Sequence, residues 1–342
     1  MMLCNSIACA PKITINQLKP GTALKLQQLR YLVTIVHQRM NMSAAADALY
    51  TSQPGVSKQI KLLEDELGIE LFTRSGKHLT GLTEAGEAVF QRAEEVLQQV
   101  RSIRLHAAEF RDQQCGQLSI ATTHTQARYA LPPVIRQFRQ RYPNVAVQIH
   151  QGSPTQIAQM AVSGQVDFAI ATEALELFED LVMLPCYRWN RSIIMPVDHP
   201  LISVTELTLA AIAQYPLITY VFGFTGRSQL DIAFRQQQLQ PNVVLTATDA
   251  DVIKTYVRTG LGIGIIARMA HDTLLDADLI RRDVDHLFES SLTSIGFRRS
   301  LYLRQFMYEF MVLFAPHLTA GRVAACQRGD LSVLTGLDLP LY

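Results

Sequence analysis

The stretch MSAAADALYTSQPGVSKQIKLLEDELG, residues 42–68, predicts two short helices joined by a tight turn. The first is rich in alanine, a strong helix former that lets a neighbouring helix pack closely. In the second, apolar residues recur every three or four positions, which is the spacing of one helix face. These residues are Val56, Ile60, Leu63 and Leu67. The pattern therefore predicts a helix pair whose apolar stripe is buried in a small core.

The opposite face of the second helix carries polar groups. Its residues are Gln53, Pro54, Ser57, Lys58 and Lys61, with Ser52 directly before them. Uncharged hydrogen-bonding side chains can read base edges, and lysines can contact phosphates. The alternative, a hairpin buried in a core, would not gather these side chains on one face. The segment is therefore interpreted as a helix-turn-helix that binds double-stranded DNA.

Helix boundaries can be predicted from residue type. Ser43 is expected to cap the first helix, because a hydroxyl can accept a bond from a free N–H in the first turn. Pro54 fits a first turn, where no hydrogen bond is lost. Gly68 follows the last apolar position and predicts the end of the second helix.

Residues 69–83 alternate between apolar and polar and turn at residues 75–76, which predicts a hairpin wing. Arg74 and Lys77 lie near its tip, where the phosphate backbone of DNA is expected to pass. From about residue 83 a long helix is predicted. Its apolar residues alternate steps of four and three: Val89, Ala93, Val96, Val100, Ile103 and Ala107.

Such a seven-residue rhythm is typical of a coiled-coil seam. The alternative is packing on the core of the chain's own domain. Pairing of two helices suits a DNA-binding protein, because a dimer can contact two half-sites. The seam therefore predicts self-association.

The second half of the chain alternates strand and helix patterns, from residue 117 to about 298. The chain is predicted to cross between two blocks near Tyr187 and again near Leu292. The expected fold class is α/β, with an N-terminal winged helix-turn-helix and a two-lobed effector domain like that of periplasmic binding proteins. A ligand cleft is expected at the carboxyl ends of the strands.

Neutral hydrogen-bonding side chains stand at the predicted strand-to-helix junctions. They are Thr123, Thr125, Gln126, Ser153, Thr172 and Thr225. Hydroxyls and free N–H groups at helix N-termini form an anion site. The alternative for each threonine or serine is a simple helix cap. No run of Lys or Arg accompanies these positions, so the pattern predicts a small anionic effector held mainly by neutral donors.

Several motifs are more specific: SQPGVSKQIKLLEDELGIELFTRSGKHLT at 52–80, IATTHTQARYALP at 120–132 and TATDADVIKTYVR at 246–258. Together they resemble the LysR-type transcriptional regulators over residues 24–318, in particular the activators of cysteine-biosynthesis genes and their sulfate-starvation paralogues. The resemblance implies that Thr123, Thr125, Gln126, Thr172 and Thr225 line the effector site.

The resemblance also implies partners and domains. The implied effector is N-acetylserine or O-acetylserine, or sulfate or thiosulfate; the alternative is adenosine phosphosulfate. Further implied partners are a second copy through the linker helix, a tetramer, and RNA polymerase. The expected division is as follows: an N-terminal extension, 1–23; the DNA-binding domain, 24–82; the linker helix, 83–112; the effector domain, 113–316; and a C-terminal tail, 317–342. Lobe I would comprise 113–187 and 291–316, and lobe II 188–290.

Composition excludes other classes of protein. Lys and Arg total 31 against 30 Asp and Glu, so DNA affinity must come from a local patch. The five cysteines form no C-x-x-C pair, which disfavours a metal site. No nucleophile–base constellation indicates an enzyme, and no cofactor is expected. A solute-binding protein is disfavoured because no secretory signal or membrane span is predicted. A cytoplasmic regulator is the expected class.

Overall fold

The computed structural model describes residues 24–76, 78–109, 114–172, 175 and 178–342. The chain divides into two compact units, residues 1–104 and 105–342, which are described separately. The N-terminal unit contains helices and a two-stranded hairpin, and the second unit contains two five-stranded sheets. The predicted fold class is confirmed. No helix in the described part of the chain has the length and apolar character that a bilayer span requires.

Three helices form the core of the N-terminal unit: α1 (Leu26–His37), α2 (Met42–Ala48) and α3 (Gln53–Leu67). The apolar stripe of α3 is buried as predicted, with Val56, Ile60 and Leu63 fully enclosed. Ser52 caps α3 by accepting a hydrogen bond from the Gly55 N–H. The prediction that Ser43 caps α2 is wrong. Asn41 does so instead, because the helix already begins at Met42, and the Asn41 side-chain oxygen accepts bonds from the Ser43 and Ala44 N–H groups.

The wing and the long helix follow directly. The wing consists of β1 (Phe72–Ser75) and β2 (His78–Leu82), paired antiparallel. Helix α4 (Glu84–Glu109) then begins, with the Thr83 hydroxyl accepting a bond from the Gly86 N–H. Gly86 lies directly against the Leu71 carbonyl, which any larger side chain would strike. This contact fixes the start of α4 against the wing.

The predicted seam of α4 divides into two parts. Ala93 is buried in the core of its own unit, and Val89 packs against that core. The first part of the seam is therefore intramolecular, which corrects the prediction for these two residues. Farther along, the Val96 side chain is 41% exposed and Ile103 is 68% exposed. The later part of the helix thus presents apolar side chains that its own unit does not cover.

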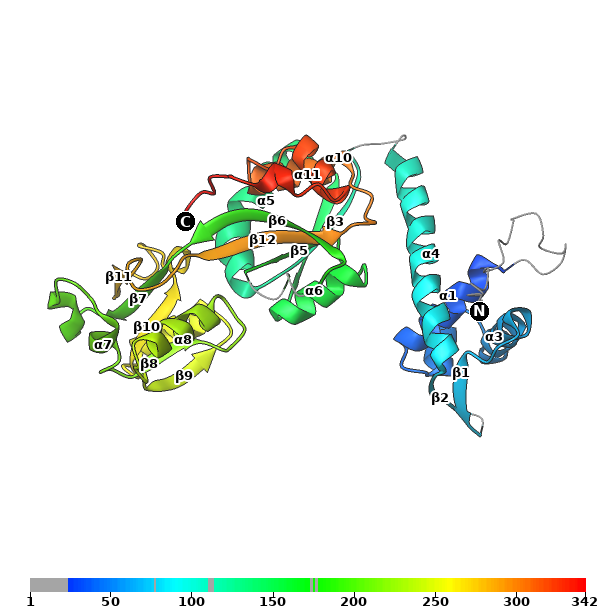
Figure 1. Cartoon of the computed structure of the whole chain (residues 1–342), viewed down its shortest axis with the longest axis horizontal. Coiled ribbons are helices and arrows are strands. Elements are labelled where there is room, and N and C mark those ends of the chain that lie inside the picture. Colours follow the sequence, from blue (N-terminus) through cyan, green and yellow to red (C-terminus); the bar gives the residue numbers. More distant parts are fainter. Residues whose placement is uncertain (1–23, 77, 110–113, 173–174, 176–177) are drawn as a thin grey trace, which may run out of the picture. The chain divides into compact units, whose positions relative to one another are not determined.

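Lobe I is built on a mixed sheet in the order β4-β3-β5-β12-β6. Its strands are β3 (Gly116–Thr122), β4 (Val145–Gln151), β5 (Phe168–Ala171), β6 (Leu181–Trp189) and β12 (Ser291–Arg298). Its helical segments are η2 (Gln126–Ala130), α5 (Leu131–Arg141), α6 (Pro154–Val162), α10 (Gln305–Phe314) and α11 (Ala320–Gln327). Figure 1 shows α6 on one side of this sheet and α10 and α11 on the other.

Lobe II has a second mixed sheet in the order β11-β7-β10-β8-β9. Its strands are β7 (Arg191–Pro196), β8 (Leu217–Tyr220), β9 (Val243–Ala247), β10 (Ile263–Ala267) and β11 (Leu279–Asp283). Its helical segments are η4 (Pro200–Ser203), α7 (Leu209–Ile212), α8 (Arg227–Gln236), α9 (Ala250–Arg258) and η5 (Arg268–Ala270). The strands β8, β9 and β10 run parallel, so their carboxyl ends lie at one edge.

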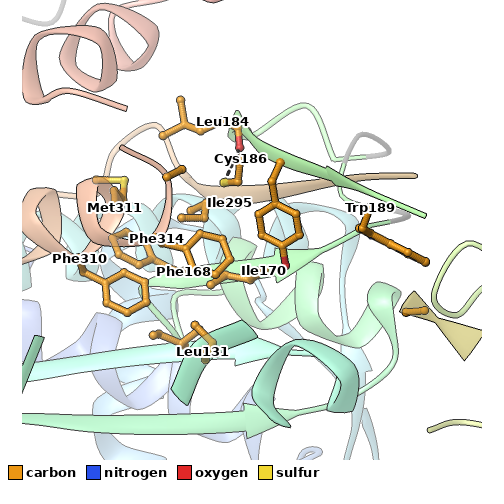
Figure 2. Packing of buried hydrophobic residues seen from close by; sticks show 14 of the residues in the cluster. Leu131, Phe168, Ile170, Leu184, Cys186, Trp189, Ile295, Phe310, Met311 and Phe314 are labelled. Carbon is orange, nitrogen blue, oxygen red and sulfur yellow. Dashed lines mark hydrogen bonds between the residues drawn. The ribbon is translucent and has the colours of Figure 1, made fainter. Parts of the chain in front are cut away.

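The two crossovers between the lobes lie close to the predicted positions. β6 continues to Trp189, so the first crossover comes two residues later than the expected boundary at Tyr187. Trp189 is fully buried, and Figure 2 shows it at the end of the lobe I core opposite Phe310. Phe306, Phe310 and Phe314 of α10 are buried, and their spacing places them on one face of that helix. The same hydrophobic cluster continues into lobe II through residues of α9.

Residues 317–342 form an integral part of lobe I. Val323 and Cys326 of α11 belong to its core, and η6 (Ser332–Leu334) packs against that core. The last residues lie along β6, where the Arg188 N–H donates to Pro340 O and the Tyr342 N–H donates to Arg188 O, each at 2.8 Å. The segment predicted to be a C-terminal tail is therefore packed onto lobe I, because its apolar side chains are buried and its main chain pairs with β6.

Candidate functional site

The polar face of α3 is exposed to solvent. Ser52, Gln53, Pro54, Ser57, Lys58 and Lys61 are all exposed. Between α3 and the wing lies a groove of about 620 Å³, whose lining includes Ser57, Lys61 and Arg74. Because the apolar stripe of α3 holds the helix on its core, this opposite face is free to enter a DNA groove.

Arg74 does not extend freely from the wing. Its Nη2 lies 3.0 Å from Glu64 Oε2, and Glu64 Oε1 accepts the Leu71 N–H at 3.0 Å. Glu64 thus joins α3 to the wing. Its carboxylate also neutralises the charge of Arg74, the residue that was predicted to contact the phosphate backbone of DNA. Lys77, the other wing residue assigned to DNA, lies outside the described residues.

The predicted effector residues of lobe I follow the carboxyl end of β3. Thr123, Thr125 and Gln126 are at most 5% exposed. The expected regular helix after them begins instead as a π-helical turn, η2, before α5 takes over at Leu131. Such turns interrupt the regular hydrogen-bond ladder and occur frequently at functional sites. The turn places buried polar side chains where a regular helix was expected.

A hydrogen-bonded chain connects Gln126 with Thr172. The Gln126 side-chain amide donates to Thr293 Oγ1 at 3.3 Å, and Thr293 Oγ1 lies 3.2 Å from Thr172 Oγ1. The Tyr187 hydroxyl donates to Gln126 Oε1. Burial raises the pKa of Tyr187 well above its usual range, so the hydroxyl remains a donor at neutral pH. Two of the predicted residues are therefore brought together by a partner on β12.

Thr225 lies in lobe II, between β8 and α8. Its hydroxyl is buried and has no hydrogen-bond partner in the described part of the structure. Thr125, in lobe I, also has a buried hydroxyl with no hydrogen-bond partner of ordinary geometry. This hydroxyl lies near Tyr220, and it partly offsets the rise that burial causes in the pKa of Tyr220. Buried hydroxyls are normally paired. These two are therefore candidate donors to a bound ligand.

Ser153 has a different role. Its hydroxyl accepts the Gln156 N–H at 3.3 Å, and its own N–H donates to the Gln156 side chain at 2.9 Å. This reciprocal pair is a capping box at the start of α6. The alternative considered for the sequence, a simple helix cap, accounts for Ser153 in full.

Several residues of this region were not predicted as site residues. Tyr187 and Trp189 come from β6, Arg191 from β7 and Thr293 from β12. Within its own strand each of these residues has the pattern of an ordinary core position, so the local sequence does not indicate that it belongs to a ligand site. Only the meeting of β6 and β12 beside β5 reveals their common location.

Side chains of both lobes also meet beside the effector residues. The Tyr129 hydroxyl of η2 donates to Asp251 of α9 at 2.8 Å, and Lys254 Nζ lies 3.1 Å from that hydroxyl. Arg128 Nε lies 2.7 Å from Asp251. Burial alone would lower the pKa of Lys254, but hydrogen bonds to Asp276 and Tyr129 outweigh it and raise that pKa. Lys254 therefore remains charged and joins α9 to η2.

One group in the described part of the chain resembles a metal-ligand cluster: His124, Asp249 and Asp251, with ligand atoms within 4.8 Å of one another. Asp251 already pairs with Arg128 and Lys254, and Asp249 caps α9. The acidic side chains thus have structural partners, and the cluster does not support a metal assignment.

Comparison with known proteins identifies both units. Residues 26–87 match the model of the bacterial regulatory helix-turn-helix protein, lysR family, and residues 111–318 match the LysR substrate binding domain. The HTH-type transcriptional regulator CysB of Haemophilus influenzae is 55% identical over 305 residues, which cover 89% of this chain and 94% of that protein.

Two further comparisons agree. The HTH-type transcriptional regulator SsuR of Burkholderia cenocepacia is 52% identical and covers 89% of this chain and 99% of its own length. The crystal structure of the cofactor-binding domain of the Cbl transcriptional regulator superposes with a TM-score of 0.60 at 43% identity, covering 61% of this chain and 92% of that domain.

Proposed function

This chain belongs to the LysR family of helix-turn-helix transcriptional regulators, and we propose that it activates sulfur-assimilation and cysteine-biosynthesis genes in response to a small anionic effector. It is a regulator and not an enzyme. The names of its relatives support the target genes. The proposed effector is N-acetylserine or O-acetylserine, with sulfate or thiosulfate as inorganic counterparts.

The observation that carries the effector proposal is a group of neutral donors, buried except for the partly buried Thr172, that follow strands of both lobes. Thr123, Thr125 and Gln126 come from lobe I, Thr172 from the end of β5, and Thr225 from lobe II. Hydroxyl and amide groups can bind an oxyanion or carboxylate by hydrogen bonding. Because they carry no charge, release of the anion leaves no unpaired buried cation among them.

The close burial of these side chains favours a small anion. Thr125 and Gln126 are 1% and 2% exposed, so little ligand surface can be accommodated without separation of the lobes. Adenosine phosphosulfate, the alternative effector, would require a much wider opening for its nucleoside. Similarity to the Cbl domain is the specific observation that favours this alternative.

We propose that effector binding changes the relative stability of two arrangements of the lobes. A ligand shifts such an equilibrium only through its differential affinity for the two states. Contacts such as Tyr129–Asp251 join the lobes and would change when they move. On the DNA side, the exposed face of α3 would read bases, and pairing through α4 would place two readers on two half-sites. RNA polymerase is proposed as the final partner.

Calorimetric titration of the full chain tests the effector assignment. N-acetylserine, O-acetylserine, sulfate, thiosulfate and adenosine phosphosulfate are added separately, and binding to a cysteine-biosynthesis promoter is measured with each ligand. Binding of an acetylserine together with an altered footprint is expected. Binding of adenosine phosphosulfate alone would establish the alternative, and no response to any of these ligands would refute the proposed effector class.

A further inference from the structure

Thr225 occupies an unusual backbone conformation. Its φ is 45°, and the next residue, Gly226, has a φ of 70°. A β-branched residue in this left-handed region is a genuine outlier. Local strain of this kind persists only when surrounding contacts hold it, and such contacts are concentrated at functional sites. Some other group must therefore hold the segment that presents the Thr225 hydroxyl.

Arg191 is that group. Its Nη2 donates to Gly226 O at 2.6 Å and to Ser291 Oγ at 2.8 Å, while Nη1 donates to Glu289 O at 3.1 Å. Arg191 begins β7 at the first crossover, and Ser291 begins β12 at the second. A side chain on Gly226 would collide with the guanidinium. One planar guanidinium therefore fixes both crossovers and the Thr225 segment.

The same guanidinium lies over Trp189, which contacts a lobe I residue of the proposed site. Its carbon atom Cζ is 5.2 Å from the centre of the Trp189 ring, and the Trp189 indole donates to Thr172. Its charge also acts on Tyr220, whose hydroxyl bonds the Ala267 N–H. Arg191 is only 3% exposed, so water screens its charge weakly.

We propose that Arg191 is a positioning residue that makes the effector site selective for anions. It holds Thr225 in its strained conformation through Gly226, and its buried charge stabilises an anion bound by the neutral donors. The ligand class is a small oxyanion or carboxylate. The inference rests on the proposed effector site and deepens it, since it supplies the cationic contribution that the sequence pattern lacks.

The test compares two anions of different charge. Sulfate and N-acetylserine are titrated into the full chain and into Arg191→Gln, Arg191→Lys and the control Arg188→Gln. Arg188 is exposed and belongs to neighbouring β6. Because an electrostatic contribution scales with ligand charge, Arg191→Gln is expected to weaken sulfate about tenfold or more and the monoanion about threefold. Arg191→Lys is expected to recover part of the loss for sulfate, and the control to match wild type.

A purely structural role predicts equal losses for both ligands and no recovery by lysine, and that result overturns the selectivity proposal. Unchanged sulfate affinity in Arg191→Gln also overturns it. If Arg191→Gln does not fold, Ser291→Ala provides a second test, because it removes one acceptor of the guanidinium. Sulfate binding is then expected to weaken about threefold. Unchanged sulfate affinity in Ser291→Ala would also overturn the proposal. If the wild-type chain binds neither anion, the proposed function itself is refuted. That outcome differs from failure of the Arg191 proposal, in which the wild-type chain still binds the anions.

Discussion

The Trp189 indole N–H donates a hydrogen bond to Thr172 Oγ1 over 3.2 Å. Trp189 ends β6 at the crossover between the lobes, whereas Thr172 directly follows β5. The bond therefore links a proposed effector residue to the point about which the lobes would move. Trp189 is also the single tryptophan of the chain. Its fluorescence consequently reports on the site without any added label.

Thr172→Val is expected to weaken effector binding while preserving the fold. The substitution keeps the side-chain shape but removes both the acceptor for Trp189 and the proposed contact to the anion. The loss should be about 1.5–3 kcal/mol if the ligand is charged, or roughly tenfold or more in Kd. Trp189 fluorescence during a sulfate titration provides the measurement. Thr205→Val, on the exposed surface of lobe II, serves as the control; equal affinities of the two variants would remove Thr172 from the site.

Substitutions on the exposed face of α3 are expected to change base preference. Ser57→Ala and Gln53→Ala each remove a hydrogen-bonding group that faces away from the core. Loss of a base-edge contact should reduce discrimination at one or two positions by about 1–3 kcal/mol. Footprints and binding to a library of operator sequences measure this effect. Gln38→Ala, exposed at the end of α1, should behave like wild type. Unaltered footprints for both α3 variants would place recognition elsewhere.

The Arg74–Glu64 pair predicts opposite effects on DNA affinity. Arg74→Ala should weaken binding to all sequences alike and reduce the salt slope by about one unit, if the guanidinium moves to a phosphate. Glu64→Gln should strengthen binding, because it releases Arg74 while keeping an acceptor for the Leu71 N–H. Fluorescence anisotropy at several salt concentrations measures both. An unchanged slope in Arg74→Ala would mean that the residue serves only the contact with Glu64.

Self-association is expected to depend on the later part of α4. Val96→Asp or Ile103→Asp would bury an unpaired carboxylate in a helix pair and should dissociate it. Light scattering measures the mass, with Gln91→Asp, an exposed position near the start of the helix, as the control for added charge. If both seam variants keep the mass of the wild-type oligomer, the exposed apolar side chains have another role.

Acid stability should depend on Asp276. Burial alone would raise its pKa, but hydrogen bonds from Lys254, the Asp272 N–H and Arg258 outweigh it, so the pKa lies below its ordinary value. The carboxylate therefore stabilises the native state above the unfolded pKa, and this contribution is lost as the pH falls through the lower folded value, below about pH 4. Thermal unfolding should show Asp276→Asn destabilised at pH 7 but closer to wild type at pH 3. A constant difference in stability would contradict the charge-based explanation.

The local sequence pattern was sufficient to predict the helices and the wing of the DNA-binding domain, because these elements lie close together in the sequence. The stripe of Val56, Ile60 and Leu63 is buried and the opposite face is exposed, as helical periodicity requires. Capping was less predictable: Ser43 and Asn41 are both suitable cap residues, and the choice depends on where the preceding turn ends. The seam of α4 failed at Val89 and Ala93 for a related reason, since periodicity identifies an apolar face but not its partner.

The sequence by itself determined the class of the molecule: a helix-turn-helix reader, a long helix, and a two-lobed α/β domain with hydroxyl groups at the strand ends. Tertiary structure alone decided which side chains meet there. Thr172, Trp189 and Thr293 join because three strands distant in sequence become neighbours, and Arg191 meets Ser291 only because the chain crosses twice between the lobes. Periodicity records which face of an element is apolar, whereas contacts between distant segments depend on strand order and burial, which no local pattern encodes.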